Sequence, residues 1–245
     1  MKLRRFVLLI RSALFNAAFF TWTAFVAIAF LPSLLLPRSV SVWGQRRWAK
    51  GLVWLLRKMI GIEMEVRGRQ YIGCEPVLVA AKHQSAWDTF IYQTVLADPA
   101  MVMKRELFWI PLYGWYARKS RMIGVDRAGG ARALKAMVAH ALTQISDGRS
   151  VVIFPEGTRS AVGARLPYQP GVAALARALS VPVVPVAVNS GAFWPRRGFI
   201  KRPGTIVLEF LPPIDSSLRR KDFMLTLETD IEAAVEKLVQ AQLDA

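Results

Sequence analysis

Hydrophobic residues are distributed differently before and after residue 62. Residues 12–37 contain no charged side chain, and a run of this length is in the range of a bilayer span. Asn16, Thr21 and Thr23 dilute the run, and an arginine lies on each side of it. The pattern predicts a helix that either spans the membrane or dips into it, and the flanking charges assign no orientation. A cleaved signal peptide is less favoured, because no small-residue cleavage site follows the apolar run cleanly.

A second helix with one basic side is expected over residues 46–60. At about 100° per residue, its cationic side chains fall within one third of the helical wheel and its apolar side chains occupy the opposite half. Trp43 and Trp54 are exceptions on the charged side. Two environments suit the apolar half: the globular core, or the headgroup region of an anionic leaflet, which the charge count favours. Residues 1–62 are therefore expected to form a basic, membrane-associated helical hairpin.

After residue 62 the hydrophobic pattern is typical of an α/β domain, which we place at residues 63–245. Short apolar runs predict strands at residues 63–66, 77–81, 101–103, 122–125, 151–154, 181–188 and 205–211. Longer periodic stretches predict helices at residues 86–96, 131–145, 171–179 and 225–243. The alternation predicts a mostly parallel or mixed sheet flanked by helices. The prolines within residues 181–188 favour an edge or irregular strand there.

The charge of the chain is strongly positive and unevenly placed. Lys and Arg number 33 against 17 Asp and Glu, a net charge of +16, and residues 1–62 contain ten basic residues and no acidic one. The Trp and Leu residues between these charges favour an anionic lipid surface as the partner over nucleic acid. Cys74, the only cysteine, is expected to be a small buried side chain near a turn.

His83 and Asp88 follow the predicted strand at residues 77–81, and open α/β sheets bind ligands at the carboxyl ends of their strands. Ser85, three residues before Asp88, fits a capping box that starts a helix at Ala86 and leaves His83 in the preceding turn. From this turn the imidazole can reach the carboxylate, which would fix its tautomer and stabilise the imidazolium. Spacing alone equally allows Asp88 to be only a helix cap and His83 an ordinary loop residue.

A second charged turn, at residues 154–160, also follows a predicted strand. Glu156, Gly157 and Thr158 supply a tight turn with exposed backbone donors, and Arg159 supplies a guanidinium that can hold a phosphate in a bidentate pair. The alternative is a surface turn with a salt bridge between Glu156 and Arg159.

Two further cations, Lys104 and Arg127, each follow a short predicted strand. Their position at strand ends makes them candidates for the same phosphate site. Taken one at a time, such residues are more often solvated cations.

Together these motifs resemble those of the 1-acyl-sn-glycerol-3-phosphate acyltransferases. The resemblance covers about residues 77–190, and the matching boxes, in the order of the family, are residues 83–88 (H-x-x-x-x-D), 124–127, 154–160 and the proline-bearing 181–188. Two positions depart from the pattern of the family. Lys82 stands where an Asn usually precedes the His, and Gly124 stands where a bulkier residue or a proline is common.

The resemblance implies transfer of a fatty acyl group from an acyl carrier protein or coenzyme A thioester to the sn-2 hydroxyl of lysophosphatidic acid. The product would be phosphatidic acid, made for phospholipid biosynthesis. His83, oriented by Asp88, would be the general base, and Arg159 would anchor the phosphate of the substrate. Glu156, Gly157 and Thr158 would build the turn, with no metal or other cofactor required. We expect the enzyme on anionic membrane lipids at a bacterial inner membrane, with its catalytic domain on the cytoplasmic side.

Two other functions are also compatible with these residues. A related enzyme would use the same His and Asp to acylate glycerol 3-phosphate or a lyso-aminolipid. A basic, membrane-tethered binding protein without catalysis would explain the charge but not the ordered boxes.

Overall fold

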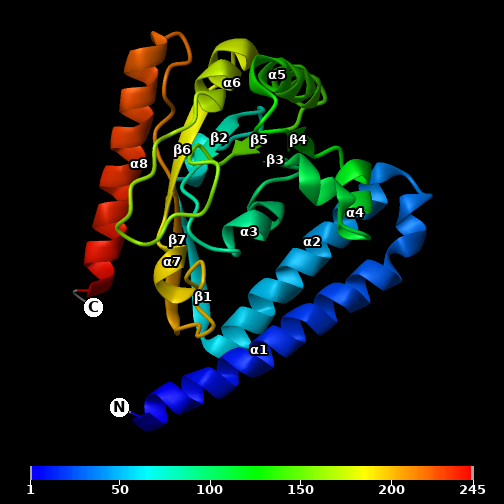
Figure 1. Cartoon of the computed structure of the whole chain (residues 1–245), viewed down its shortest axis with the longest axis vertical. Helices are drawn as coiled ribbons and strands as arrows, with labels where there is room; N and C mark the ends of the chain where they lie inside the picture. The colour runs from blue at the N-terminus through cyan, green and yellow to red at the C-terminus, as the bar shows by residue number, and fades with distance from the viewer. Residues whose placement is uncertain (1, 244–245) are drawn as a thin grey trace.

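The computed structural model describes residues 2–243, which are built around a seven-stranded sheet of order β1-β7-β6-β2-β5-β3-β4 (Figure 1). The strands β6, β2, β5, β3 and β4 are mutually parallel, β7 is antiparallel to β6, and β1 is parallel to β7. The predicted α/β class with a mixed sheet is therefore confirmed. The strand bounds are Ile62–Arg67 (β1), Leu78–Ala81 (β2), Ala100–Lys104 (β3), Ile123–Val125 (β4), Val151–Ile153 (β5), Val183–Val188 (β6) and Gly204–Phe210 (β7).

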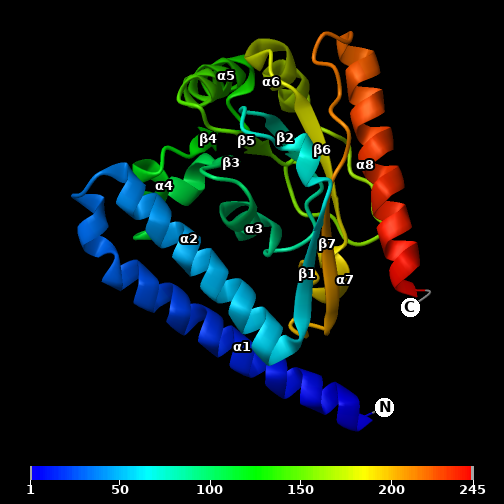
Figure 2. The same ribbon diagram turned by 180° about the vertical axis from the view of Figure 1, so that it is seen from behind.

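Helices cover both faces of the sheet (Figures 1 and 2). One face carries α5, α6 and α8, and the opposite face carries α3 and the N-terminal pair α1 and α2. The α-helices are Lys2–Ala29 (α1), Arg38–Leu55 (α2), Asp88–Val95 (α3), Tyr113–Lys119 (α4), Gly130–Ser146 (α5), Gly171–Leu179 (α6), Ser190–Phe193 (α7) and Arg220–Leu243 (α8). Shorter helical turns are Leu31–Leu34 (η1), Leu56–Ile60 (η2), Arg69–Tyr71 (η3) and Arg105–Trp109 (η4).

Two hydrophobic clusters lie on the two faces of the sheet. Along β2, Val79 and Ala81 belong to the cluster under α1 to α3, whereas Leu78 and Ala80 belong to the cluster under α5, α6 and α8. This alternation follows from the two-residue period of a strand. All four residues of β2 are buried because helices cover both faces, which explains their continuous apolar sequence.

The predicted edge position for residues 181–188 is wrong, because β6 lies inside the sheet between β7 and β2. Pro185 is opposite Ala80 on β2, and its carbonyl accepts a hydrogen bond from Leu211 N at 2.9 Å. The β6–β7 ladder begins one residue later, at the Val186–Phe210 pair. The N and O atoms of a strand residue point to the same side, so the missing N–H of Pro185 faces Leu211, just past the end of β7. This pair keeps only the hydrogen bond from Leu211 N to Pro185 O.

Most predicted elements agree with the structure to within a few residues, and α6 has the predicted bounds. The helix expected from Ala86 begins at Asp88 instead, and α8 begins at Arg220, earlier than the apolar pattern indicated. The expectation that Cys74 is buried is wrong, since its side chain is exposed.

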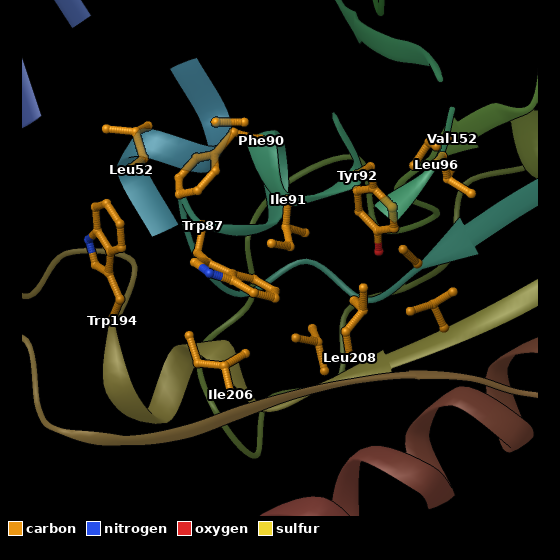
Figure 3. Close-up of a cluster of buried hydrophobic side chains, with 14 of the residues drawn as sticks. Leu52, Trp87, Phe90, Ile91, Tyr92, Leu96, Val152, Trp194, Ile206 and Leu208 are labelled. Carbon is orange, nitrogen blue, oxygen red and sulfur yellow. The ribbon is translucent and has the colours of Figure 1, made fainter. Parts of the chain in front are cut away.

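The N-terminal hairpin is present, but the apolar half of its second helix faces protein rather than lipid. Ala49, Leu52, Leu56 and Ile60 are all buried in the cluster that includes α3. Figure 3 shows Leu52 beside Phe90 of α3. Trp43 and Trp54, on the basic side, are more than half exposed. The preference for a headgroup location of the apolar half is therefore wrong, because α3 and the sheet offer a complete apolar surface for it.

Polar contacts hold the hairpin to the rest of the chain. Arg38 of α2 forms an ion pair with Asp98, which also pairs with the buried Arg149 at 3.1 Å. Lys201 lies over the rings of Phe15 and Trp194 at 5.6 and 5.3 Å. Burial lowers the pKa of Lys201, and the cation–π contacts tie α1 to the loop before β7.

Candidate active site

The box at residues 83–88 and the box at residues 154–160 lie side by side because β2 and β5 are parallel neighbours. The loop with His83 follows β2, which ends at Ala81. The charged turn at residues 154–160, called the arginine turn from here on, follows β5, which ends at Ile153. Ser160 N donates to His83 O at 2.8 Å and joins the two loops directly. The carboxyl edge of the sheet therefore positions the two predicted halves of the site next to each other.

His83 and Asp88 are in hydrogen-bond contact, with 3.0 Å between His83 Nδ1 and Asp88 Oδ2. Asp88 Oδ2 also accepts the backbone N–H groups of Gln84 at 2.7 Å and Ser85 at 2.8 Å. Because this oxygen acts as an acceptor, Nδ1 carries the proton and Nε2 keeps its lone pair. Asp88 thus holds the loop before α3 and orients the imidazole, whereas the predicted cap is absent, because the cap residue of α3 is Trp87 and it makes no side-chain cap hydrogen bond.

The imidazole is also held by packing. Its ring stacks on the ring of Phe154 with 4.1 Å between centroids and 18° between planes. Tyr92 of α3 makes a T-shaped contact with Phe154, with 6.2 Å between ring centroids, and its buried hydroxyl has no hydrogen-bond partner among the described residues. Burial, and secondarily the Asp88 carboxylate, raises the pKa of Tyr92 well above its ordinary value. This tyrosine therefore stays neutral beside Asp88.

His83 opens into a cavity of about 1430 Å³ that extends between the sheet and the hairpin. The predicted cations Lys104, Arg127 and Arg159 line the same cavity, together with Gly157 and Thr158. The rest of the wall is mainly apolar and comes from α1, α2, α4 and α5, including Val26, Ala27, Trp48, Tyr116, Leu134 and Met137. One cavity therefore combines a base, a cationic region and a long apolar wall.

The arginine turn has the conformation that its glycine suggests. Gly157 has φ of +66°, a region that side chains with a Cβ rarely adopt. A Cβ placed there would lie 3.9 Å from the guanidinium carbon of Arg127, so Arg127 extends across this turn. The carbonyl of Arg159 accepts a hydrogen bond from Arg196 Nη1 at 2.6 Å, which holds the backbone of the turn.

Glu156 does not face a substrate or Arg159, contrary to the surface-turn alternative. Its Oε1 is 2.9 Å from Lys82 Nζ, and its Oε2 accepts His83 N–H at 3.3 Å and the Ser160 hydroxyl at 3.2 Å. The carboxylate is fully buried and both oxygens are used inside the protein. Glu156 therefore joins the two loops, and direct contact with a substrate is not what its geometry supports.

The two departures from the family pattern each have a local partner. An added Cβ at Gly124 would lie 3.0 Å from the ring of Phe108, which occupies the space that a larger residue would need. Lys82 is buried against two carboxylates, those of Glu156 and Glu232.

Sequence reasoning missed Ser190 and Glu232, which contact the site residues from distant parts of the chain. Neither lies in one of the boxes. The signal that pointed toward Glu232 was the unusual Lys82, since a lysine next to a buried strand requires an anionic partner.

Comparisons with known proteins agree with this geometry. Residues 63–189 match the family model described as Acyltransferase. The chain is 36% identical over 202 residues to the 1-acyl-sn-glycerol-3-phosphate acyltransferase of Pseudomonas aeruginosa, covering 80% of this chain and 77% of that protein. It is 29% identical over 208 residues to 1-acyl-sn-glycerol-3-phosphate acyltransferase alpha of Mus musculus, covering 82% and 72%.

A solved structure shares the fold over nearly the whole chain. The crystal structure of the 1-acyl-sn-glycerophosphate acyltransferase of Thermotoga maritima aligns with a TM-score of 0.73 at 24% identity, covering 97% of both chains. The sequence comparisons reach the same group of enzymes independently. The chain belongs to the 1-acyl-sn-glycerol-3-phosphate acyltransferase family.

Proposed function

We propose that this protein transfers a fatty acyl group from a thioester to the sn-2 hydroxyl of lysophosphatidic acid, forming phosphatidic acid. The observation that carries the proposal is the single cavity that holds His83, Arg159 and an apolar wall. Such a cavity matches an acceptor with a hydroxyl, a phosphate and an acyl chain. The relatives with this named activity support the same reaction.

The chemistry begins at His83 Nε2, which takes the proton of the acceptor hydroxyl. The oxygen attacks the thioester carbonyl carbon, the tetrahedral intermediate collapses, and the carbon–sulfur bond breaks. The departing thiolate then receives the proton from the imidazolium. Base catalysis of this kind contributes roughly 10²- to 10⁴-fold, and Asp88 stabilises the imidazolium through Nδ1.

The cationic side of the cavity would bind the acceptor phosphate. Arg159 is the principal anchor, because its guanidinium can pair with two phosphate oxygens, and Arg127 extends across the same turn. Lys104 and the backbone of Gly157 and Thr158 complete this side of the cavity. Holding the phosphate places the hydroxyl beside His83, which lowers the entropic part of the barrier.

The acyl donor is an acyl carrier protein thioester or a coenzyme A thioester, and no metal or other cofactor takes part in the proposed steps. Both donors are anionic, and the net charge of +16 favours their approach. The apolar wall between the sheet and the hairpin suits the fatty acyl chain.

The hairpin is the proposed membrane anchor. By length and composition, residues 3–29 could cross a bilayer, and only 17% of the apolar window is buried within the described structure. Exposed apolar side chains on α1 and the following turn include Phe6, Ile10, Phe25, Ile28 and Leu35. Basic residues and exposed tryptophans nearby suit the anionic lipids of a leaflet. We place the enzyme at a bacterial inner membrane with its catalytic domain on the cytoplasmic side.

One assay tests the reaction and its specificity. Purified protein is incubated with lysophosphatidic acid, glycerol 3-phosphate or a lyso-aminolipid, each with both donor types, and products are quantified by mass spectrometry. We expect phosphatidic acid to form faster than any other product. A faster reaction with another acceptor would assign the enzyme to that acceptor, and salt-sensitive nucleic-acid binding without acyl transfer would contradict an enzymatic role.

A further inference from the structure

Lys82 lies beneath the reaction centre and is only 1% exposed. Its ammonium is 2.9 Å from Glu156 Oε1, 2.6 Å from Glu232 Oε1 and 3.3 Å from the carbonyl of Ala164. A buried ammonium is costly unless paired and hydrogen-bonded, and these three acceptors occupy all three of its N–H groups. The position is therefore a built ion site rather than an accidental surface pair.

Two buried carboxylates share this one cation. Glu156 belongs to the turn after β5, and Glu232 belongs to α8, outside the residues that match the family model. Tyr168 donates a hydrogen bond to Glu232 Oε1 at 3.0 Å. Burial, followed by the Glu232 carboxylate, raises the pKa of Tyr168, so the hydroxyl remains a donor. Without Lys82, two carboxylates would face each other in a largely buried site.

The ion site connects to the backbone of the base. Glu156 Oε2 accepts the N–H of His83 at 3.3 Å, and it also accepts the Ser160 hydroxyl. Ser160 in turn donates from its backbone N–H to the carbonyl of His83 at 2.8 Å. The backbone N–H and carbonyl of His83 are therefore held by Glu156, which pairs with Lys82, and by Ser160, which is hydrogen-bonded to Glu156.

We propose that Lys82 and Glu232 are positioning residues that couple α8 to the orientation of His83. The inference rests on the proposed acyl transfer. The Asn usual in the family at the position of Lys82 can satisfy one carboxylate, whereas the longer lysine reaches a second carboxylate on α8. Lys82 and Glu232 form a buried charge pair, and Glu232 lies outside the family boxes.

Removing the cation should lower the turnover number more than it changes substrate affinity. In Lys82→Met, repulsion between Glu156 and Glu232 moves Glu156 away from the N–H of His83. A displacement of about 1 Å at a reacting group can reduce the rate by roughly 10²-fold. We therefore expect kcat to fall by about 10- to 100-fold, with KM for lysophosphatidic acid changed by less than about 3-fold.

The decisive measurement is rescue by a second substitution. Glu232→Gln removes one of the two opposed charges, so the Lys82→Met/Glu232→Gln variant should regain at least about 5-fold in kcat over Lys82→Met alone. Glu236→Gln, an exposed change one turn further along α8, is the matched control and should give no rescue. Lys221→Met, exposed at the start of α8, controls for the loss of a lysine.

Thermal melting identifies a temperature at which every variant is folded. Should Lys82→Met not fold, Lys82→Asn replaces it, because the amide still donates to Glu156, and the same rescue is expected. A kcat within about 2-fold of the wild type, or equal rescue by Glu236→Gln, would show that Lys82 only supports the fold.

A second measurement does not depend on the substrate. Diethyl pyrocarbonate modifies accessible neutral imidazoles, and the chain has two histidines, His83 and the exposed His140. The ratio of their modification rates should change by at least about 3-fold in Lys82→Met and return in the double variant. If the wild type failed to acylate lysophosphatidic acid, the proposed function would fall, whereas an unchanged ratio would overturn the positioning role alone.

Discussion

Ser190 Oγ donates a hydrogen bond of 2.6 Å to Asp88 Oδ1, across 102 positions of sequence. Ser190 begins α7 one residue after β6, whereas Asp88 begins α3 after β2, and these two strands are neighbours in the sheet. The contact occupies Oδ1 and leaves Oδ2 to His83 and two backbone N–H groups. Asp88 is thus held from both sides, as an orienting carboxylate must be.

Removing the imidazole of His83 should nearly abolish acyl transfer without weakening membrane binding by the N-terminal hairpin. His83→Ala is expected to lower kcat by roughly 10²- to 10⁴-fold, because no other imidazole lines the described cavity. Binding to vesicles of phosphatidylglycerol and phosphatidylethanolamine, measured by flotation, should be unchanged. His140→Ala, on the exposed side of α5, is the control and should keep full activity. More than about a tenth of activity remaining in His83→Ala would contradict the base role.

The hydrogen bond from Ser190 should contribute to both stability and catalysis. Ser190→Ala removes a donor to a buried carboxylate, and hydrogen bonds to charged groups contribute about 1.5–3 kcal/mol. We expect the free energy of unfolding, from urea titration, to fall by about that amount. The loss of kcat should be smaller than in His83→Ala, since the backbone donors still hold Asp88. Ser39→Ala, at an exposed position, should change neither quantity.

The phosphate role of Arg159 predicts a selective effect on one substrate. Arg159→Ala should raise KM for lysophosphatidic acid by about tenfold or more, because it removes charge-assisted hydrogen bonds to the phosphate. KM for the acyl thioester should change far less in initial-rate measurements. Arg177→Ala, exposed on α6, is the matched control. Equal increases in both KM values would indicate that Arg159 is structural.

The hairpin offers a pair of leucines that separates packing from membrane binding. Leu52 of α2 is fully buried in the cluster with Phe90 and Trp194 (Figure 3), whereas Leu35 between α1 and α2 is 92% exposed. Leu52→Ala should lower the free energy of unfolding by about 2–5 kcal/mol. Leu35→Ala should stay within about 0.5 kcal/mol of the wild type. The Leu35→Ala variant should instead bind vesicles more weakly in flotation. Weaker vesicle binding by Leu52→Ala, or a large loss of stability in Leu35→Ala, would contradict a buried Leu52 and a membrane-facing Leu35.

Most helices and strands could be predicted from the spacing of apolar residues, and the motif residues could be identified from short stretches of sequence. The bounds of α6 could be predicted because apolar residues recur with helical spacing between a glycine and a polar end. The contact between the His83 loop and the arginine turn could also be predicted, because both follow the carboxyl ends of parallel strands in one sheet. These predictions depend on neighbours in sequence or on a general rule of α/β sheets.

Other features depended on partners that no local pattern identifies. The prolines of β6 indicated an edge or irregular strand, yet β6 lies between β7 and β2, and the missing N–H of Pro185 falls just past the end of β7. The apolar half of α2 was assigned to lipid because hydrophobicity alone does not distinguish a bilayer from α3. Glu156 was expected to help build the phosphate-binding turn, but its partner Lys82, 74 positions away, could not be predicted from that turn.

By itself, the sequence determined the α/β class, the hairpin and the side chains that can perform acyl transfer, because these follow from periodicity and from residue chemistry. Only the tertiary structure decided which way Glu156 faces, that Ser190 holds Asp88, and that Glu232 reaches Lys82 across 150 positions. The physical reason is that a buried charge takes its partner from whichever segment packs against it, and that segment is selected by the fold as a whole.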